Sequence, residues 1–253
     1  MRTLAVIPAR LGATRLPRKP LRLLAGLPLV VRVWERVRDS GVVDACVIAT
    51  DSDEVAAIAR QHGAAVEMTS PDHPSGTDRV AEVAGRPAYG DFDTILNVQG
   101  DEPFVEFDAL RGATGMVTNH GFALGTAAAL AGLDALMNPH VVKVVAADDG
   151  RAMYFSRAAI PFLRDPADAS LLRDRIWQHV GTYAYTRDAL ARWVALPPHP
   201  LERIERLEQL RPLAAGLAMG VACMAGTGRG GIDTEDDLIR ANADWEHFNQ
   251  GQH

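Results

Sequence analysis

Basic residues with the chemistry to bind phosphate gather near the start of the chain. The stretch VIPARLGATRLPRKPL, residues 6–21, follows a short apolar run and contains four of them: Arg10, Arg15, Arg18 and Lys19. An arginine guanidinium can donate two hydrogen bonds to one phosphate group, and a lysine ammonium adds a compact positive charge. Gly12 and Ala13 are small enough for a phosphate to approach the main-chain N–H groups. The stretch therefore predicts a loop that binds a triphosphate.

Charge is unevenly distributed over the chain. Its formal net charge is −6, whereas residues 1–34 contain seven basic groups and no acid, which leaves −13 for the remainder. A surface that binds a nucleic acid polymer would need a wide basic patch. The distribution instead favours a small anionic ligand at one loop, with a solvated basic surface as the simpler alternative.

A candidate metal ligand stands at the end of a second apolar run. The stretch DTILNVQGDEP predicts a buried strand that ends in polar residues, Gln99, Gly100, Asp101 and Glu102. Ligands of open parallel sheets bind at the carboxyl ends of the strands. Mg²⁺ prefers oxygen ligands, so Asp101 at this edge is suited to hold it. Glu102 is interpreted as a surface acid at the strand end.

Strand-like and helix-like runs alternate through the first half of the chain. Strands are expected within residues 4–9, 45–51, 64–70 and 93–103, and helices within 27–41, 52–63 and 76–84. This rhythm predicts an α/β fold: a mostly parallel, Rossmann-like sheet with helices on both faces. Serine or aspartate precedes the second helix as a candidate N-cap, and Gly41 and Gly63 are candidate stops.

The second half predicts more strands, a hairpin and three helices. Asp149-Gly150 is a two-residue turn signal between the strand-like runs of residues 141–157. A helix is expected over residues 200–216, with an apolar stripe formed by Leu201, Ile204, Leu207 and Leu210. The closing helix, residues 233–248, has Thr234 as its N-cap with Asp237 three residues on. We expect a single domain over residues 1–253, with an inserted β-hairpin lobe at roughly 130–185.

The two cysteines and the N-terminus bear on location. Cys46 and Cys223 lie in apolar runs without CxxC spacing, and they are expected to be buried thiols in a reducing compartment. The apolar run at Leu4–Pro8 is too short for a signal peptide or a membrane span. A cytoplasmic protein with no membrane partner is therefore expected.

The quoted basic loop closely resembles the N-terminal signature of the sugar-acid cytidylyltransferases. Further stretches match this family in the same order: ATDSDEVA, HPSGTDRVAEVA, NVQGDEPF, NPHVVKVV, YFSRAAIPF, HVGTYAY, LERIERLEQLR and GIDTEDDL. Together the matches run from residue 5 to about 240. Within the family the chain is most similar to the enzymes whose acceptor is 3-deoxy-D-manno-octulosonate (KDO).

The resemblance implies an activity, a fold and a metal. The expected fold is that of the nucleotide-diphospho-sugar transferases. The expected reaction joins CTP to the anomeric hydroxyl of KDO, releasing pyrophosphate and giving CMP-KDO for lipopolysaccharide synthesis, with Mg²⁺ held by Asp101 and Asp233. Taken without the resemblance, Asp233 fits a helix cap better than a metal ligand. Catalytic residues are then expected at Arg10, Arg15 and Lys19, which would stabilise the leaving pyrophosphate, and at the two aspartates.

The resemblance also implies a substrate site and a homodimer. The residues expected near the cytosine, the ribose and the sugar acid are Ser75, Gly76, Arg79, Gln99, Arg157, His179, Tyr185, Glu208 and Gln209. An apolar hairpin at Val141–Val145 is the expected interface of an isologous dimer.

Three positions depart from the family pattern, and two alternatives for the function stay open. Arg18 stands where the family has glycine, Ala13 where it has serine, and Glu235 where it has proline. The first alternative is a cytidylyltransferase with another acceptor, such as an amino analogue of KDO or another sugar acid. The second is a non-catalytic nucleotide-binding or regulatory module, which would have no use for both aspartates.

Overall fold

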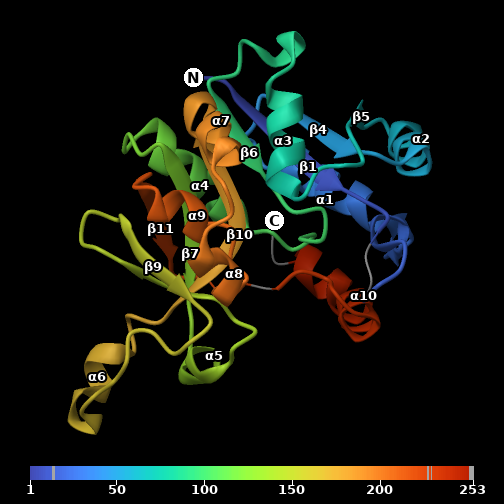
Figure 1. Cartoon of the computed structure of the whole chain (residues 1–253). Coiled ribbons are helices and arrows are strands. Elements are labelled where there is room, and N and C mark those ends of the chain that lie inside the picture. Colours follow the sequence, from blue (N-terminus) through green and yellow to red (C-terminus); the bar gives the residue numbers. More distant parts are fainter. Residues whose placement is uncertain (13–14, 227, 229, 251–253) are drawn as a thin grey trace. The chain divides into compact units, whose positions relative to one another are not determined.

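Parallel strands form the sheet of the first of two units into which the chain divides. This unit comprises Met1–Phe107 and the C-terminal segment that contains Asp233, and the second comprises Asp108–Gly228. The computed structural model, drawn in Figure 1, describes residues 1–12, 15–226, 228 and 230–250, with side chains through Phe248. Ala13, one of the positions that depart from the family pattern, lies outside the described residues.

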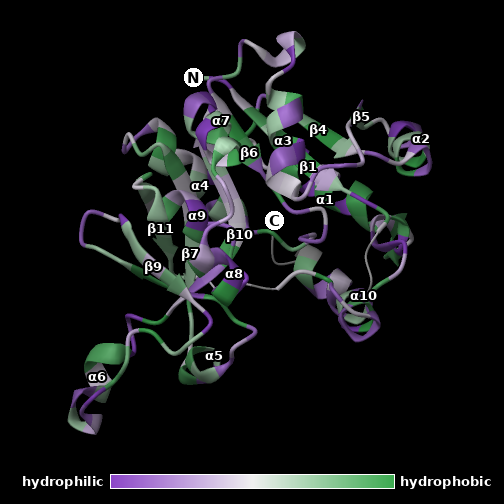
Figure 2. Ribbon diagram, viewed as in Figure 1, coloured by the Kyte–Doolittle hydropathy of each residue, from purple (hydrophilic) through white to green (hydrophobic). Residues whose placement is uncertain are grey.

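The sheet of the first unit has the order β6-β1-β4-β5, with all neighbours parallel. Its strands are β1 (Thr3–Ala9), β4 (Ala45–Thr50), β5 (Ala65–Met68) and β6 (Thr94–Asn97). Residues Leu4–Ile7 of β1 are all fully buried, as expected for a central strand covered on both faces. Figure 2 shows the matching apolar colour along β4.

Helices flank this sheet, and their ends follow the sequence signals. They are α1 (Leu29–Arg38), α2 (Asp53–Gln61), α3 (Gly76–Ala84) and α10 (Glu235–Gln250), with the short 3₁₀ turns η1 (Lys19–Leu21) and η2 (Pro87–Tyr89). Ser52 caps α2 and Ser75 caps α3 through their side-chain oxygens. Gly41 and Gly63 have positive φ angles of 68° and 82°, as expected for helix stops. The predicted α/β fold with its parallel, helix-flanked sheet is confirmed.

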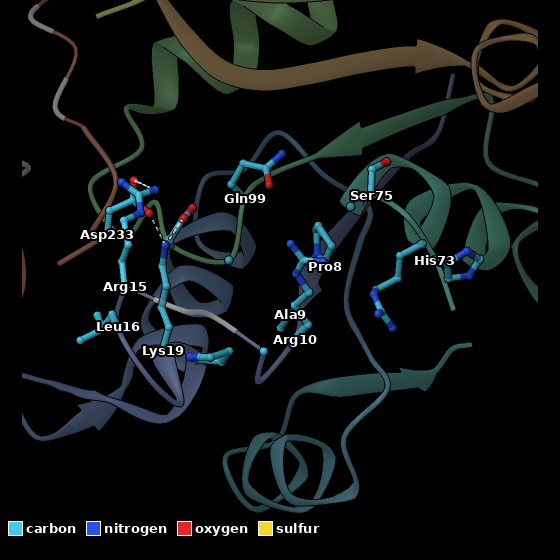
Figure 3. A pocket seen from close by; sticks show the side chains of 16 residues that line it. Pro8, Ala9, Arg10, Arg15, Leu16, Lys19, His73, Ser75, Gln99 and Asp233 are labelled. Atoms are coloured by element: carbon cyan, nitrogen blue, oxygen red, sulfur yellow. Dashed lines mark hydrogen bonds and ion pairs between the residues drawn. The ribbon is translucent and has the colours of Figure 1, made fainter. Parts of the chain in front are cut away.

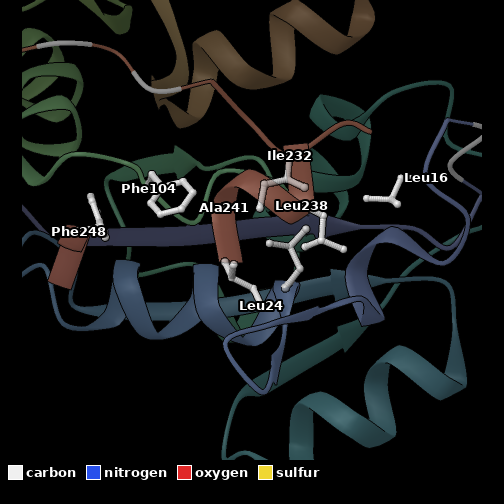
Figure 4. Close-up of a cluster of buried hydrophobic side chains, with 8 residues drawn as sticks. Leu16, Leu24, Phe104, Ile232, Leu238, Ala241 and Phe248 are labelled. Atoms are coloured by element: carbon white, nitrogen blue, oxygen red, sulfur yellow. The ribbon is translucent and has the colours of Figure 1, made fainter. Parts of the chain in front are cut away.

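A buried apolar cluster fixes the C-terminal helix against the start of the chain. Leu16 and Leu24 pack with Phe104, Ile232, Leu238 and other residues in the cluster drawn in Figure 4. Leu24 belongs to a short hairpin of β2 (Leu23–Leu24) and β3 (Leu27–Pro28). Because Ile232 is fixed by this packing, the neighbouring Asp233 is directed toward the basic loop.

The second unit has a mixed sheet. Strand β7 (Leu124–Leu130) is parallel to β11 (Met219–Met224) and antiparallel to β10 (Trp177–Thr186), which pairs with β8 (Lys143–Ala146). Strand β9 (Ala152–Ser156) pairs with β8 across the predicted turn, where Gly150 has a φ angle of 82°. The helical segments are α4 (Phe107–Thr118), α5 (Leu133–Met137), η3 (Pro166–Asp168), α6 (Ala169–Leu172), α7 (Arg187–Ala195), α8 (Pro200–Glu205) and α9 (Leu210–Ala214). The predicted lobe at 130–185 falls within this unit.

The helix predicted over residues 200–216 is wrong, because the segment is broken. Arg206 adopts a left-handed conformation with a φ angle of 55°, which separates α8 from α9. Glu202 and Arg211 tie the two short helices together, with 2.6 Å between Oε1 and Nη2. The predicted apolar stripe fails at Ile204, which is 77% exposed.

The cysteines differ from each other. Both are free thiols, but Cys223 is exposed, so its predicted burial is wrong. It lies on β11, whose side chains alternate between the two faces of the sheet. Cys46 is only partly buried, and burial raises the pKa of its thiol to about 12. Across the described ranges, no helix is long and apolar enough to cross a membrane.

Candidate functional site

The basic loop leaves the carboxyl end of β1 and lines a pocket of about 410 Å³ in the first unit. This volume suits a small-molecule ligand. All nine predicted site residues that belong to this unit line the pocket: Arg10, Arg15, Lys19, Ser75, Gly76, Arg79, Gln99, Asp101 and Asp233. The site thus combines residues far apart in the sequence, as Figure 3 shows.

Lys19 joins the two predicted metal ligands. Its Nζ donates a hydrogen bond of 2.8 Å to Asp233 Oδ1 and a second, short one to Asp101 Oδ2. Burial by itself lowers the pKa of Lys19, but the two aspartates outweigh it and raise the pKa above 10.5. Two carboxylates separated by 132 positions therefore converge on a single cation.

The arginines of the loop differ in their contacts. Arg15 Nη2 donates to Asp233 Oδ2 at 2.9 Å, and its side chain is 68% exposed. Arg18 has a left-handed backbone with a φ angle of 57° and pairs with Glu54. Glycine adopts this conformation without strain, so the departure from glycine here has a backbone penalty. Arg10 lies exposed at the pocket rim.

Glu235, the other described departure, stands in the first turn of α10. Its carboxylate accepts a hydrogen bond of 2.8 Å from Arg22 Nη1. An acid in the first turn of a helix is favourable, so the exchange of proline for glutamate fits this place.

Two glycines allow the walls of the pocket to come close. A Cβ added at Gly100 would lie 2.8 Å from the main-chain oxygen of Pro8, closer than real Cβ contacts allow. A Cβ added at Gly76 would lie 3.2 Å from Pro8 Cγ. The strand end that precedes Asp101 and the start of α3 are thereby brought against the end of β1.

Arg79 and His73 support the opposite wall. Arg79 is 3% exposed, and its guanidinium contacts Thr69 Oγ1 and, at 3.3 Å, Asp51 Oδ2. His73 lines the pocket and holds Glu82 with 2.6 Å between Nε2 and Oε2. The sequence reasoning missed His73, although it stands two residues before Ser75 in the HPSGTDR stretch.

Glu102 is a further group that the sequence reasoning left as a surface acid. Burial first, and then the charge of Asp101, raise the pKa of Glu102 to about 8. A Cβ added at Gly231 would lie 3.1 Å from Glu102 Oε1 and 3.4 Å from Asp101 Cγ. Glu102 therefore faces the segment that leads to Asp233 rather than open solvent.

The five other predicted site residues belong to the second unit. Arg157 follows β9, His179 and Tyr185 lie on β10, and Glu208 and Gln209 lie between α8 and α9. His179 contacts Thr126 Oγ1 at 3.0 Å, and burial lowers its pKa to about 3. Tyr185 is fully buried, and its ring centroid lies 5.5 Å from that of Trp193.

The pairing of strands brings Arg157 and His179 to one end of the second unit's sheet. Ser156 on β9 and Gln178 on β10 both lie opposite Lys143 on β8, and each precedes a predicted site residue. The rings of Phe155 and His179 are 5.0 Å apart between centroids.

The acidic residues of the pocket fit a divalent cation. Asp101 and Asp233 already share one positive group, and their side chains are 29% and 42% exposed. Hard oxygen ligands with access to water suit Mg²⁺, which keeps several of its waters. Among the described residues no group of three or more histidine, cysteine or acidic side chains forms a complete cage. Two carboxylates are a common protein contribution to a site completed by substrate phosphates.

Comparison with known proteins identifies the family. The model of the family described as cytidylyltransferase matches residues 4–219. The chain is 64% identical over 246 residues to the 3-deoxy-manno-octulosonate cytidylyltransferase of Gemmatimonas aurantiaca, covering 97% of this chain and 95% of that protein. It is 44% identical over 239 residues to the protein of the same name from Polynucleobacter asymbioticus, covering 94% and 93% of the two chains.

Two solved structures are similar to this chain. A structure of CMP:2-keto-3-deoxy-manno-octonic acid synthetase complexed with CTP matches with a TM-score of 0.89 and 35% identity, over 98% of this chain and 99% of that one. The 4-diphosphocytidyl-2C-methyl-D-erythritol synthase of Anaerococcus prevotii shares the fold, with a TM-score of 0.63 and 14% identity over 97% and 98% of the two chains. The chain belongs to the cytidylyltransferase family.

Proposed function

We propose that this protein transfers the CMP moiety of CTP to the anomeric hydroxyl of KDO and releases pyrophosphate. The observation that carries the proposal is the convergence of Arg15 and Lys19 with Asp101 and Asp233 at one pocket. Cations can hold the phosphates of a nucleotide, and paired carboxylates can hold a divalent cation beside them. The names of the relatives support CTP and KDO as the substrates.

The proposed reaction forms one bond and breaks one. The anomeric oxygen of the sugar bonds to the α-phosphorus, the bond from that phosphorus to the bridging oxygen breaks, and the hydroxyl proton passes to solvent. Arg10, Arg15 and Lys19 hold the phosphates that become pyrophosphate and stabilise the charge that develops there. Asp101 and Asp233 would hold Mg²⁺, which would neutralise charge on the α-phosphate and favour ionisation of the hydroxyl.

The second unit supplies the acceptor residues in this proposal. Arg157 binds the carboxylate of the sugar acid, and Glu208 and Gln209 bind its hydroxyl groups. A partly buried, neutral His179 suits hydrogen bonding to a hydroxyl rather than pairing with a carboxylate. These residues, more than the nucleotide pocket, decide between KDO and an alternative acceptor.

Turnover tests the proposal directly. The protein is incubated with CTP, Mg²⁺ and KDO, and pyrophosphate release and the mass of the product are measured. CMP-KDO is the expected product, and an amino analogue of KDO and other sugar acids serve as competing acceptors. Binding of CTP without pyrophosphate release from any acceptor would support the non-catalytic alternative.

A single substitution tests the metal. Asp101→Asn is expected to leave the thermal unfolding temperature nearly unchanged and to abolish Mg²⁺-dependent turnover, because it removes a ligand charge at the pocket. Asp108→Asn, at a side chain that is 78% exposed, is the matched control and should retain full activity. Normal turnover by Asp101→Asn would rule out the metal assignment.

We also propose a homodimer that works in the cytoplasm. Free thiols at Cys46 and Cys223 suit a reducing compartment. Several large apolar side chains of the second unit are exposed, which supports an interface there. The product would serve lipopolysaccharide synthesis, as the family resemblance implies.

A further inference from the structure

Lys143 is a buried lysine that binds only main-chain oxygens. Its residue surface is 0% exposed, and its Nζ donates to the carbonyl oxygens of Asn138, Val141 and Arg157 at 2.8, 2.7 and 2.7 Å. An ammonium group has three N–H donors, and here all three are used. No described acidic side chain lies within ion-pair distance of it. Buried charges are usually paired, so a buried lysine among carbonyls needs another explanation.

The carbonyl of Arg157 connects this lysine to the proposed acceptor site. Lys143 stands on β8, directly opposite Ser156 on β9. Through one ammonium it fixes the end of β9 to the turn that precedes β8, which contains Asn138 and Val141. The backbone position of Arg157 thus depends on Lys143.

Glu205 holds the same residue from the other side. Its carboxylate accepts hydrogen bonds from Ser156 Oγ at 2.7 Å and from the Arg157 main-chain N–H at 2.9 Å. Its own carbonyl accepts one from Arg157 Nε at 2.8 Å. Glu205 ends α8 and precedes the turn that contains Glu208 and Gln209, so it joins two parts of the proposed acceptor site.

Arg157 is consequently fixed at four atoms. Its N and O are held as described, its Nε donates to Glu205, and its Nη1 donates to the Pro139 carbonyl at 3.2 Å. Within the described part of the chain, the remaining nitrogen Nη2 makes no hydrogen bond. The guanidinium has one fixed direction, and the nitrogen left for a ligand is the one that a carboxylate can use.

We propose that Lys143 and Glu205 are positioning residues for the acceptor: they hold Arg157 so that Nη2 is directed at the carboxylate of the sugar acid. The inference rests on the proposed function, in which Arg157 binds that carboxylate. A side chain fixed before binding loses little conformational freedom when the ligand arrives, which increases affinity. Neither Lys143 nor Glu205 touches the substrate in this account.

The charges of Lys143, Arg157 and Glu205 support this proposal. Burial first, and then the neighbouring Arg157 cation, lower the pKa of Lys143, while Glu205 opposes them. Two cations and one anion therefore share this corner of the second unit. An incoming carboxylate supplies the second negative charge.

Steady-state kinetics test the proposal in two variants. Lys143→Met removes the ammonium but keeps a similar length, and Glu205→Gln keeps the shape but removes the charge. Each is expected to raise the KM for KDO about tenfold or more, because small misplacements of a binding group have large effects, and to leave the KM for CTP within about twofold. Asp149→Asn, in the exposed turn of the same unit, is the matched control and should change neither.

A double-mutant cycle separates positioning from a general structural role. In an Arg157→Gln background, Lys143→Met and Glu205→Gln should change the KM for KDO by less than about twofold, because residues that act through one another are not additive. Additive effects would overturn the proposal. If Lys143→Met does not fold, Glu205→Gln decides alone.

An NMR measurement tests whether Arg157 is held in position, independently of enzyme activity. Hydrogen exchange at Arg157 Nε–H is expected to be at least about fivefold faster in Lys143→Met and Glu205→Gln than in the wild type, because the bond to the Glu205 carbonyl opens more often. Equal exchange rates would refute the positioning role of Lys143 and Glu205. If the wild type released no pyrophosphate with KDO, only the proposed function would be refuted. The exchange rates would still show whether Lys143 and Glu205 hold Arg157 in place.

Discussion

His179 shows how burial sets the state of one side chain. It lies on β10 between the rings of Phe155 and Tyr183, with centroids 5.0 and 5.3 Å away, and contacts Thr126 Oγ1 at 3.0 Å. Burial disfavours a positive ring here and lowers the pKa of His179 to about 3. The imidazole is therefore neutral near pH 7.

This state predicts a pH dependence of stability. An unfolded histidine has a pKa of about 6.5. Between that value and about 3 the unfolded chain binds a proton at residue 179 and the folded chain does not. The free energy of unfolding therefore falls as the pH falls through this window, by at most about 1.4 kcal/mol per pH unit from this group.

Urea unfolding at pH 7.5 and pH 4.5 measures the effect. His179→Asn should lose this part of the acid sensitivity, so its free energy of unfolding should fall less than that of the wild type. NMR of the wild-type ring should show no titration between pH 5 and 8. The same acid sensitivity in both proteins would contradict the assignment.

At the scale of single residues, the sequence predicted which groups form the pocket but not how they pair. Arg15, Lys19 and Asp101 stood out by type and by place after a strand. That Lys19 bonds to both aspartates depends on a buried cluster that contains both Leu16 and Ile232, residues 216 positions apart. His73 was overlooked because a histidine before a helix cap has no distinctive spacing.

Among the helices and turns, sequence signals gave correct predictions where residues adjacent in the sequence determine the structure. The N-cap of α2 at Ser52 and the hairpin turn at Gly150 are local, and both are confirmed. The region of α8 and α9 is different, because its apolar spacing fits one helix. Contacts of Glu205 with Ser156, 49 positions away, favour the break at Arg206, and no local pattern reports them.

The start of α10 offers a prediction at this scale. Asp237 Oδ2 accepts hydrogen bonds from the main-chain N–H groups of Asp233 and Thr234 at 3.1 and 2.8 Å, and Thr234 Oγ1 accepts from Asp237 N at 3.2 Å. This reciprocal cap confirms Thr234 as the N-cap and also holds Asp233. Asp237→Ala should lower the free energy of unfolding by about 1 kcal/mol, because the cap is lost.

The same variant should need more Mg²⁺ for half-maximal turnover, because the backbone of Asp233 is no longer held. Asp236→Ala, at an exposed residue in the same turn, is the control and should change neither quantity. If Asp237→Ala were destabilised but needed no more Mg²⁺, the helix cap would not be what holds Asp233 in place.

For the whole molecule, the exposed apolar side chains point to self-association. Leu133 and Met137 of α5 are 59% and 73% exposed, and Phe162 and Leu171 are 81% and 70% exposed. They belong to the segments that enclose a small buried cluster of Leu136, Leu172 and Ile176. In the hairpin expected as the interface, Val144 is fully buried within the chain, whereas Val141, Val142 and Val145 remain partly exposed. We propose that α5 and residues 159–172 contribute to the dimer interface beside this hairpin.

Light scattering tests this interface. The wild type should have twice the 27.3 kDa mass of one chain. Phe162→Asp combined with Met137→Asp should give a monomer, because two charges would be buried at the interface. Ile239→Asp, at a 61% exposed side chain on α10, is the control and should leave the dimer intact. A monomeric wild type would contradict the dimer itself.

The position of Lys19 has a consequence for the pocket when no ligand is bound. Two neighbouring carboxylates repel each other, and here the ammonium of Lys19 bonds to both and offsets that repulsion. The positive group between the two aspartates is thus a side chain of the protein itself. In the proposed function, a bound triphosphate would offer Lys19 a second anionic partner, and Asp101 and Asp233 would then be free to hold the proposed Mg²⁺. Occupancy of the site by nucleotide and by metal should therefore rise together rather than independently.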